Sequence, residues 1–172
     1  MKQTNLSNYF NIIYHNKTPN NSPIITSNNN NRIIKNNLNL NNNYYLLKFD
    51  GASKGNPGKA GAGAVMYDSI GNEIFTISRY LGKQTNNYAE YFALLLGLQE
   101  ASKIKIEYLK VEGDSLLVIN QINGKYKIKN EKLKTIYLAI QPLLNGFKDI
   151  KFKHIYRKNN IRADELANNA LN

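Results

Sequence analysis

The chain has 172 residues, no Cys, 42% hydrophobic residues and a formal charge of +11. This length allows one domain of ordinary size, and the lack of Cys excludes a disulfide framework, a thiolate metal site and a thiol nucleophile. The excess of Lys and Arg favours a polyanionic partner such as nucleic acid. No apolar run is long enough to cross a membrane or to form a secretory signal. We therefore expect a soluble, intracellular monomer, with nucleus, cytoplasm and organelle all left open as compartments.

Residues 1–43 differ in composition from the rest of the chain. They contain sixteen Asn and no helical or alternating period of apolar residues, and the first acidic residue of the chain is Asp50. Such a polar tract cannot bury enough apolar surface to fold. The sequence therefore predicts a disordered tail over residues 1–43 and one folded domain over residues 44–172.

The start of this tail carries a possible binding peptide over residues 3–10. Gln3, Leu6, Tyr9 and Phe10 have the spacing Q-x-x-L-x-x-Y-F, which resembles the peptide that docks onto sliding clamps of the PCNA type. A short helical turn would place the three apolar side chains on one side, ready to enter a pocket of the clamp. A chance match within low-complexity sequence, or a targeting segment without acids, are the alternatives.

The folded part alternates between strand and helix patterns, which predicts an α/β domain with three sequential strands followed by two crossover strands. The expected strands cover residues 45–50, 61–67, 73–80, 108–112 and 150–156. The expected helices cover residues 86–101, 115–122, 131–144 and 161–171.

Four acidic residues fall at related places in these elements. Asp50 and Asp114 end the first and fourth strands, and Glu90 and Asp164 lie near the starts of two helices. Parallel neighbouring strands would bring their carboxyl ends to one edge of the sheet, where α/β folds bind ligands. Carboxylates that converge there repel one another unless a divalent ion such as Mg²⁺ lies between them. The pattern predicts metal-assisted phosphoryl hydrolysis.

The blocks around these acids resemble the successive motifs of type 1 ribonuclease H, in its compact form without the long basic handle helix. The resemblance rests on Asp50-Gly-Ala-Ser-Lys-Gly-Asn-Pro-Gly58, Thr85-Asn-Asn-Tyr-Ala-Glu90, Gly113-Asp114-Ser115 and Arg162-Ala-Asp164-Glu-Leu-Ala-Asn168. It covers residues 44–172 and implies the ribonuclease H-like fold. That fold is a five-stranded mixed sheet in the order 3-2-1-4-5 with helices on both faces.

The resemblance also implies a function. The domain would be an endonuclease that hydrolyses the RNA strand of RNA:DNA hybrids, leaving 5′-phosphate and 3′-hydroxyl ends, with two Mg²⁺ ions per site and Mn²⁺ as a possible substitute. Asp50 would bridge both ions, Glu90 and Asp114 would complete the sphere of one, and Asp164 would hold the other. Further positions match family contacts to the RNA minor groove and its 2′-hydroxyls: Gly55, Asn56, Asn86 and Asn87.

An assisting residue is expected ahead of Asp164, where several family members carry a His in a mobile loop. His154 and Arg157 are the candidates, and we favour Arg157 because His154 falls within the fifth expected strand. Leu116 stands where some relatives place a substrate-contacting Gln, which puts that contact in doubt. Lys125 and Lys127 are candidates for contacts to DNA phosphates, with a solvated basic face as the alternative.

Simpler explanations stand beside these assignments. Gly55 to Gly58 makes a good turn whatever its function, Thr85 is a good helix cap, and Asp164 suits the dipole of a helix start. Glu112 and Glu165 are expected to face solvent or a Lys. Two rival functions are a non-cleaving RNA:DNA hybrid-binding module, or retroelement-derived domain, and another nuclease of the same superfamily.

Overall fold

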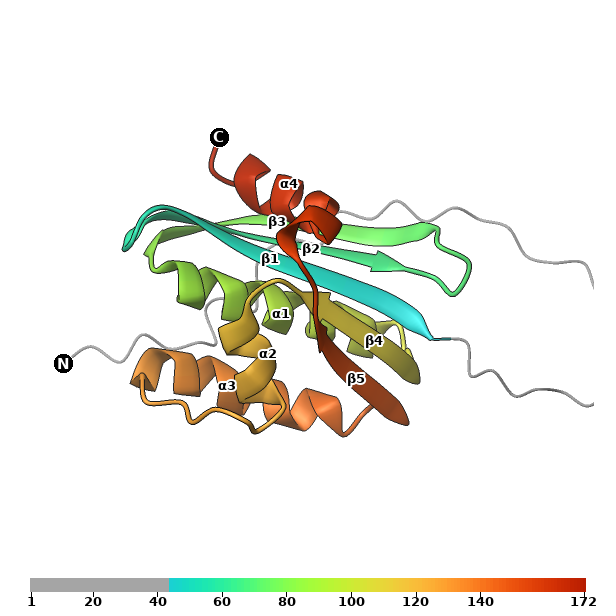
Figure 1. Cartoon of the computed structure of the whole chain (residues 1–172). Coiled ribbons are helices and arrows are strands. Elements are labelled where there is room, and N and C mark those ends of the chain that lie inside the picture. Colours follow the sequence, from blue (N-terminus) through green and yellow to red (C-terminus); the bar gives the residue numbers. More distant parts are fainter. Residues whose placement is uncertain (1–43) are drawn as a thin grey trace, which may run out of the picture. The chain divides into compact units, whose positions relative to one another are not determined.

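The computed structural model describes residues 44–172 (Figure 1). The expected tail over residues 1–43, with the clamp-peptide residues Gln3, Leu6, Tyr9 and Phe10, lies outside the described residues. The strands are β1 (Tyr45–Gly55), β2 (Gly58–Tyr67), β3 (Glu73–Gln84), β4 (Tyr108–Gly113) and β5 (Asp149–His154). The helices are α1 (Asn86–Lys103), α2 (Leu116–Ile122), α3 (Glu131–Leu144), α4 (Ile161–Asn169) and the 3₁₀ turn η2 (Arg157–Asn159).

All five strands belong to one mixed sheet in the order β3-β2-β1-β4-β5, as predicted. β2 pairs antiparallel with both β1 and β3, whereas β4 runs parallel to both β1 and β5. Parallel pairing requires crossover connections, and α1 supplies the one between β3 and β4. β1, β4 and β5 therefore run in the same direction, and their carboxyl ends lie toward the same edge of the sheet.

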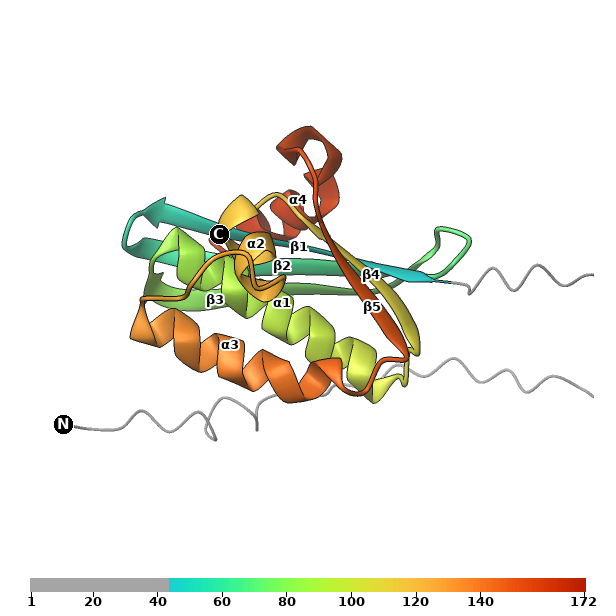
Figure 2. The ribbon, with the colours of Figure 1, turned by 60° about the horizontal axis from the view of Figure 1, so that its bottom comes forward.

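Helices cover both faces of this sheet (Figures 1 and 2). α1 lies on one face and is itself covered by α3, which explains why its apolar residues occur on nearly every side. Leu47 and Phe49 of β1 are fully buried in the core that α1 completes. α4 lies on the opposite face, across β1, β2 and β3. No helix of residues 44–172 is long and apolar enough to cross a membrane.

The first hairpin is longer than the sequence indicated. β1 continues past Asp50 to Gly55 and pairs residue by residue with β2 up to Gly58, so the prediction that Asp50 ends its strand is wrong. The strand residues that the sequence pattern did not reveal are small or polar. They lie toward the solvated end of the hairpin, where no apolar alternation is needed. Gly55 has a φ of 96°, which favours Gly at the start of the turn to Gly58.

Other boundaries differ by a few residues. β3 runs four residues beyond the expected Tyr80 to pair with the extended β2, α1 continues to Lys103, and β5 stops at His154 rather than at Tyr156. Ser115 caps α2 instead of beginning it, because its side chain accepts a hydrogen bond from the Val118 amide. These shifts leave the order and type of every predicted element unchanged.

Candidate active site

Three acids from three separate elements form one cluster. Asp50 comes from the middle of β1, Glu90 from the second turn of α1, and Asp114 from the residue that follows β4. Each offers a carboxylate oxygen within 4.8 Å of the oxygens offered by the other two. Asp50 and Glu90 are 4% and 5% exposed, so two of the three carboxylates are removed from bulk water.

Two glycines allow helices to approach Asp50 closely. A Cβ at Gly51 would lie 2.1 Å from the backbone nitrogen of Glu90, so only Gly permits α1 to pass at this distance. Gly63 pairs with Asp50 across β1 and β2, and a Cβ there would lie 2.3 Å from the backbone nitrogen of Ala167 in α4. The helices that carry Glu90 and Asp164 are thus both held against the strand segment around Asp50.

The surroundings of Asp50 and Glu90 disfavour the ionised form of both carboxyl groups. Burial, followed by the charges of Asp114 and Asp164, raises the pKa of Asp50 to about 8. Burial and the neighbouring Asp50 also raise the pKa of Glu90 well above its usual value. Glu90 Oε2 is buried without a hydrogen-bond partner among the described residues. This unpaired oxygen of Glu90 and the carboxylates of Asp50 and Asp114 together form a set of oxygen ligands of the kind that a hard divalent cation prefers.

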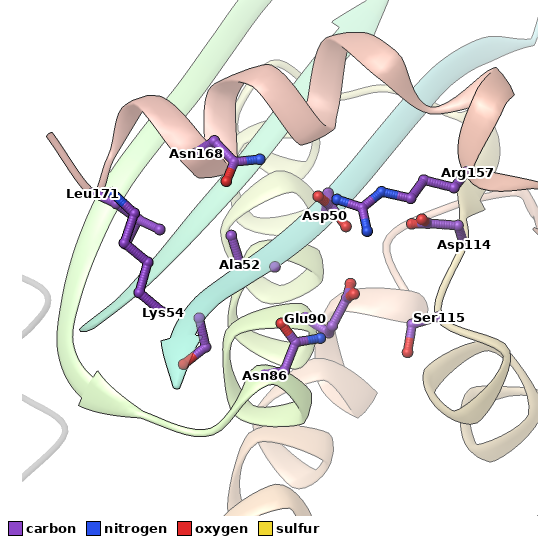
Figure 3. Close-up of a pocket in the computed structure, with 12 residues that line it drawn as sticks. Asp50, Ala52, Lys54, Asn86, Glu90, Asp114, Ser115, Arg157, Asn168 and Leu171 are labelled. Carbon is purple, nitrogen blue, oxygen red and sulfur yellow. The ribbon is translucent and has the colours of Figure 1, made fainter. Parts of the chain in front are cut away.

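Asp164 lies in the first turn of α4, outside the three-acid group. Its Oδ1 accepts a hydrogen bond of 2.5 Å from the guanidinium of Arg157 in η2. The charge of Asp164 raises the pKa of Asp50, and that of Arg157 lowers it, so both groups act on the cluster electrostatically. Figure 3 shows the Arg157 side chain reaching in between Asp50 and Asp114.

His154 has a different position. It is the last residue of β5, within the strand as predicted, and its Nε2 lies 3.2 Å from the backbone oxygen of Asp114. Its ring packs edge-on against Tyr156. Arg157 lines the cavity around the acids, whereas His154 is not among the lining residues. The geometry therefore favours Arg157 as the group that could face a substrate.

The acids open onto a cavity of about 380 Å³ (Figure 3). Several residues of its wall were given no role by the sequence patterns, among them Ser53, Lys54, Asn168 and Leu171. Ser53 and Lys54 were missed because they belong to the unrecognised end of β1. Asn160, fully buried beside Asp114, was missed as well, although a polar residue directly before a predicted helix start is a recognisable signal.

The expected substrate contacts divide between two places. Asn86, at the start of α1, lines the cavity of the acids. Asn56, Asn87 and Lys127 line a second pocket of about 380 Å³, together with Thr85 and Asn130. The backbone amide of Asn86 donates to Asn56 Oδ1 at 3.2 Å, which ties the hairpin turn to the start of α1. Gly55 and Lys125 line neither pocket.

The remaining expectations concern residues beside the motif acids. Glu112 pairs with Lys48 at 3.7 Å, and Glu165 pairs with Arg162 at 3.3 Å, so both face basic groups outside the cluster. Thr85 does cap α1, since its side chain accepts from the Tyr88 amide. Leu116 is 50% exposed at the start of α2, where an apolar side chain can offer contact but no hydrogen bond.

Comparison with known proteins gives a consistent result. The family described as reverse transcriptase-like matches residues 48–170. Ribonuclease HI of Halobacterium salinarum is 39% identical over 123 residues, which are 72% of this chain and 62% of that protein. A bifunctional protein of Mycobacterium tuberculosis is 38% identical over 127 residues, 73% of this chain and 35% of that protein. The chain thus spans only about a third to two thirds of the length of these relatives.

Two solved ribonuclease H1 structures match over nearly their whole length. The crystal structure of ribonuclease H1 from Halobacterium salinarum has a TM-score of 0.72 and 38% identity, covering 74% of this chain and 97% of that chain. The structure of LC11 ribonuclease H1 in complex with an RNA/DNA hybrid has a TM-score of 0.69 and 37% identity, covering 74% and 96%. The chain therefore belongs to the reverse transcriptase-like family, and its described part is a ribonuclease H-like domain close to type 1 ribonuclease HI.

Proposed function

We propose that this chain is an endoribonuclease that hydrolyses the RNA strand of RNA:DNA hybrids with the help of divalent metal ions. The convergence of Asp50, Glu90 and Asp114 on one partly open cavity carries the proposal. Support also comes from the family, whose relatives include ribonuclease HI enzymes and a ribonuclease H1 bound to an RNA/DNA hybrid. The excess of positive charge suits a polyanionic substrate.

The residues present fit a divalent cation. Asp50, Glu90 and Asp114 would hold one ion, because their oxygens lie close together and burial makes their unshielded charges costly. Asp164, held nearby by Arg157, would share a second ion with Asp50. Mg²⁺ suits an all-oxygen donor set, and Mn²⁺ is the natural substitute. In such sites two bound metal ions supply an activated water and stabilise the leaving oxygen of a phosphodiester.

Arg157 would act on the substrate rather than on the metal. Its side chain is 75% exposed and reaches over the acids, so a phosphate brought to the cavity would meet the guanidinium. A fixed cation there favours the transition state, in which negative charge gathers on the phosphate oxygens. Arg157 keeps its charge at any physiological pH, because a guanidinium does not lose its proton there, and the contact with Asp164 raises its pKa further. His154, by contrast, would steady the backbone of Asp114.

Selection of RNA would depend on the start of α1 and the hairpin turn. Asn86 lies beside the acids, and an amide side chain can exchange hydrogen bonds with a 2′-hydroxyl. Asn56, Asn87 and Lys127 share the second pocket, which would take the sugar-phosphate backbone further along the hybrid. Gly55 would contribute by shaping the turn, and Lys125 by its charge alone.

The test is cleavage of a labelled RNA strand offered as RNA:DNA hybrid, duplex RNA and single strand, with Mg²⁺ and with a chelator. Asp50→Asn is the matched variant, because it removes the charge at nearly constant volume. Metal-dependent cutting of the hybrid alone, lost in Asp50→Asn, is the expected result. Binding of the hybrid without cutting would instead indicate a recognition module and overturn the proposal.

A partner for the N-terminus is proposed separately, on the sequence alone. Residues 3–10, with Gln3, Leu6, Tyr9 and Phe10, would dock onto a sliding clamp of the PCNA type. Tethering to a clamp would raise the local concentration of the domain at sites where RNA primers are removed, without adding contacts to the hybrid.

A further inference from the structure

Asn160 is a fully buried amide at the point where β1, β4 and α4 meet. Its Nδ2 donates at 2.9 Å to the backbone oxygen of Phe49 in β1, and at 2.9 Å to Oδ1 of Asp114. The side chain makes no cap hydrogen bond to α4, although Asn160 stands at the cap position. A buried polar group that does not cap its helix and instead contacts an acid of the cluster calls for another explanation.

We propose that Asn160 is the positioning residue of the metal site: it fixes the orientation of the Asp114 carboxylate and ties the start of α4 to β1, so that the acids are in place before an ion binds. The proposal rests on the proposed function, because it assumes that Asp114 is a metal ligand. Partners of ligating carboxylates commonly act in this way, and their loss weakens metal affinity.

The orientation of the amide is fixed by chemistry. Both groups that face it are oxygens that only accept hydrogen bonds, so the NH₂ end must point toward them. Both hydrogens of Nδ2 are thereby used, and the carbonyl end, Oδ1, is left buried without a partner among the described residues. An amide that leaves its own oxygen unpaired in order to supply two donors is costly, and the cost is offset only if those donors are needed.

The first consequence concerns Asp114. This residue follows the last residue of β4, and its backbone oxygen lies 3.2 Å from His154. The bond from Asn160 holds the carboxylate as well, so both the main chain and the side chain of Asp114 are fixed. Rotation of this carboxylate away from Asp50 and Glu90 would break the bond to a buried donor.

The second consequence concerns the segment that carries Arg157 and Asp164. Asn160 accepts the backbone hydrogen bond from the Asp164 amide at 3.0 Å, and its own amide donates to the Arg157 oxygen at 2.9 Å. Lys48 of β1 donates to the oxygen of the preceding residue, Asn159, at 2.7 Å. Hydrogen bonds of the Lys48 and Asn160 side chains thus hold the turn between β5 and α4 against β1. Of these two side chains, Asn160 also donates to the Asp114 carboxylate.

The experiment measures Mn²⁺ binding to the full chain by isothermal titration, without nucleic acid, so that no cleavage is involved. Asn160→Leu keeps the branched shape but removes both donors, and Asn160→Ser serves in its place if the Leu variant does not fold. Gln121→Ala is the control, because Gln121 is another buried amide that bonds to Tyr91 and to the Lys127 oxygen away from the acids. Asp114→Asn and the variant that combines Asp114→Asn with Asn160→Leu complete a double-mutant cycle.

The expected result is a loss of Mn²⁺ affinity of roughly 10- to 100-fold in Asn160→Leu. Gln121→Ala should lose stability without losing Mn²⁺ affinity. In the Asp114→Asn background the Asn160 substitution should lower the Mn²⁺ affinity much less, because its effect on the metal site depends on Asp114. Equal Mn²⁺ affinity of wild type and Asn160→Leu, or the same loss in both backgrounds, would overturn the proposal. Failure of the wild type to bind Mn²⁺ would instead refute the metal site of the proposed function.

Discussion

The Arg157 guanidinium in η2 contacts the carboxylate of Asp164, seven positions further along the chain in the first turn of α4, at 2.5 Å. The same side chain lines the cavity of the three clustered acids. Arg157→Ala should therefore lower kcat for hybrid cleavage by roughly 100-fold, the usual cost of losing one fixed donor to a charged transition state. Steady-state kinetics at saturating Mg²⁺ measure this effect, and the dissociation constant of the hybrid should change little.

Arg162→Ala is the matched control for this prediction. Arg162 lies nearby in the chain, on α4, but it pairs with Glu73 at 3.0 Å and with Glu165, away from the cavity. Its loss should leave kcat within about twofold, because exposed ion pairs contribute little. An unchanged kcat in Arg157→Ala would show that the Arg157–Asp164 pair is structural only.

Sequence patterns predicted the order and type of the five strands and four α-helices, because apolar runs and helix-start signals mark them, but they did not predict the 3₁₀ turn η2. They also singled out Asp50, Glu90 and Asp114, which the structure brings together, and Asp164, which lies outside that group. They failed at the solvated end of the first hairpin, where residues 51–55 pair as strand without an apolar pattern.

The inner arrangement of the site could not be predicted, because it depends on close approaches between elements that are distant along the chain. Gly51 belongs to the block that begins at Asp50, and only the fold shows that it lets the backbone of Glu90 pass at a distance that excludes a Cβ. Asn160 stands directly before a predicted helix, and only the fold shows that its side-chain amide donates to the Phe49 oxygen and to the Asp114 carboxylate. The pairing of Arg157 with Asp164 depends on the η2 turn.

Gly51→Ala tests the first of these approaches. The added methyl group would meet backbone atoms of α1, which cannot move aside without shifting the helix. We expect a loss of about 1 to 3 kcal/mol in the free energy of unfolding, typical of overpacking, together with weaker Mn²⁺ binding. Urea denaturation and calorimetric titration measure the two effects.

Gly97→Ala provides the comparison within the same interface. A Cβ at Gly97 would meet only the side chain of Leu47, at 2.7 Å, and Leu47 lies in the core rather than at the acids. This variant should lose stability but keep its Mn²⁺ affinity. If Gly51→Ala also keeps wild-type Mn²⁺ affinity, the close approach of α1 does not position Glu90.

Stability without divalent ions should depend on pH through Asp50. Its pKa rises from 3.8 to about 8 on folding, so the folded state favours the protonated carboxyl. The stabilisation is fully present below the lower value and is lost as the pH rises through the higher one. In chelator, the melting temperature should therefore fall as the pH rises from about 4 to about 8.

Asp50→Asn isolates this contribution. The variant carries no titratable group at that position, so it should be more stable than the wild type at about pH 8 in chelator, by at least the 1.4 kcal/mol or so that one pKa unit represents. Thermal melts at matched pH measure the difference. Added Mg²⁺ should stabilise the wild type most at high pH, and a wild type that gains stability with rising pH in chelator would contradict the burial of these charges.

The clamp peptide is tested by Phe10→Ala. The aromatic side chain would fill the apolar pocket of the clamp, and such anchors typically cost 2 kcal/mol or more when truncated, which is roughly 30-fold in affinity. Pull-down of the full chain with the cognate clamp measures this, while cleavage of free hybrid should be unchanged. Equal recovery of both forms would remove the clamp proposal and leave the nuclease proposal untouched.

Lys127→Ala tests the second pocket. Lys127 lines this pocket together with Thr85, Asn87 and Asn130. If its ammonium group contacts a phosphate, the hybrid should bind several-fold more weakly, and the slope of log affinity against log salt should fall by about one. Fluorescence anisotropy with labelled hybrid over a range of salt concentrations, in Ca²⁺ or chelator to prevent cutting, measures both quantities.

Lys148→Ala is the control for charge alone. Lys148 pairs with Glu107 at 2.9 Å and lines neither the acid cavity nor the second pocket. Both variants remove one positive charge from the chain, so a purely long-range effect would weaken hybrid binding equally in the two. A change in salt slope confined to Lys127→Ala indicates a direct phosphate contact, because only a neutralised phosphate releases its counterion. Equal slopes in both variants would place the hybrid elsewhere on the surface.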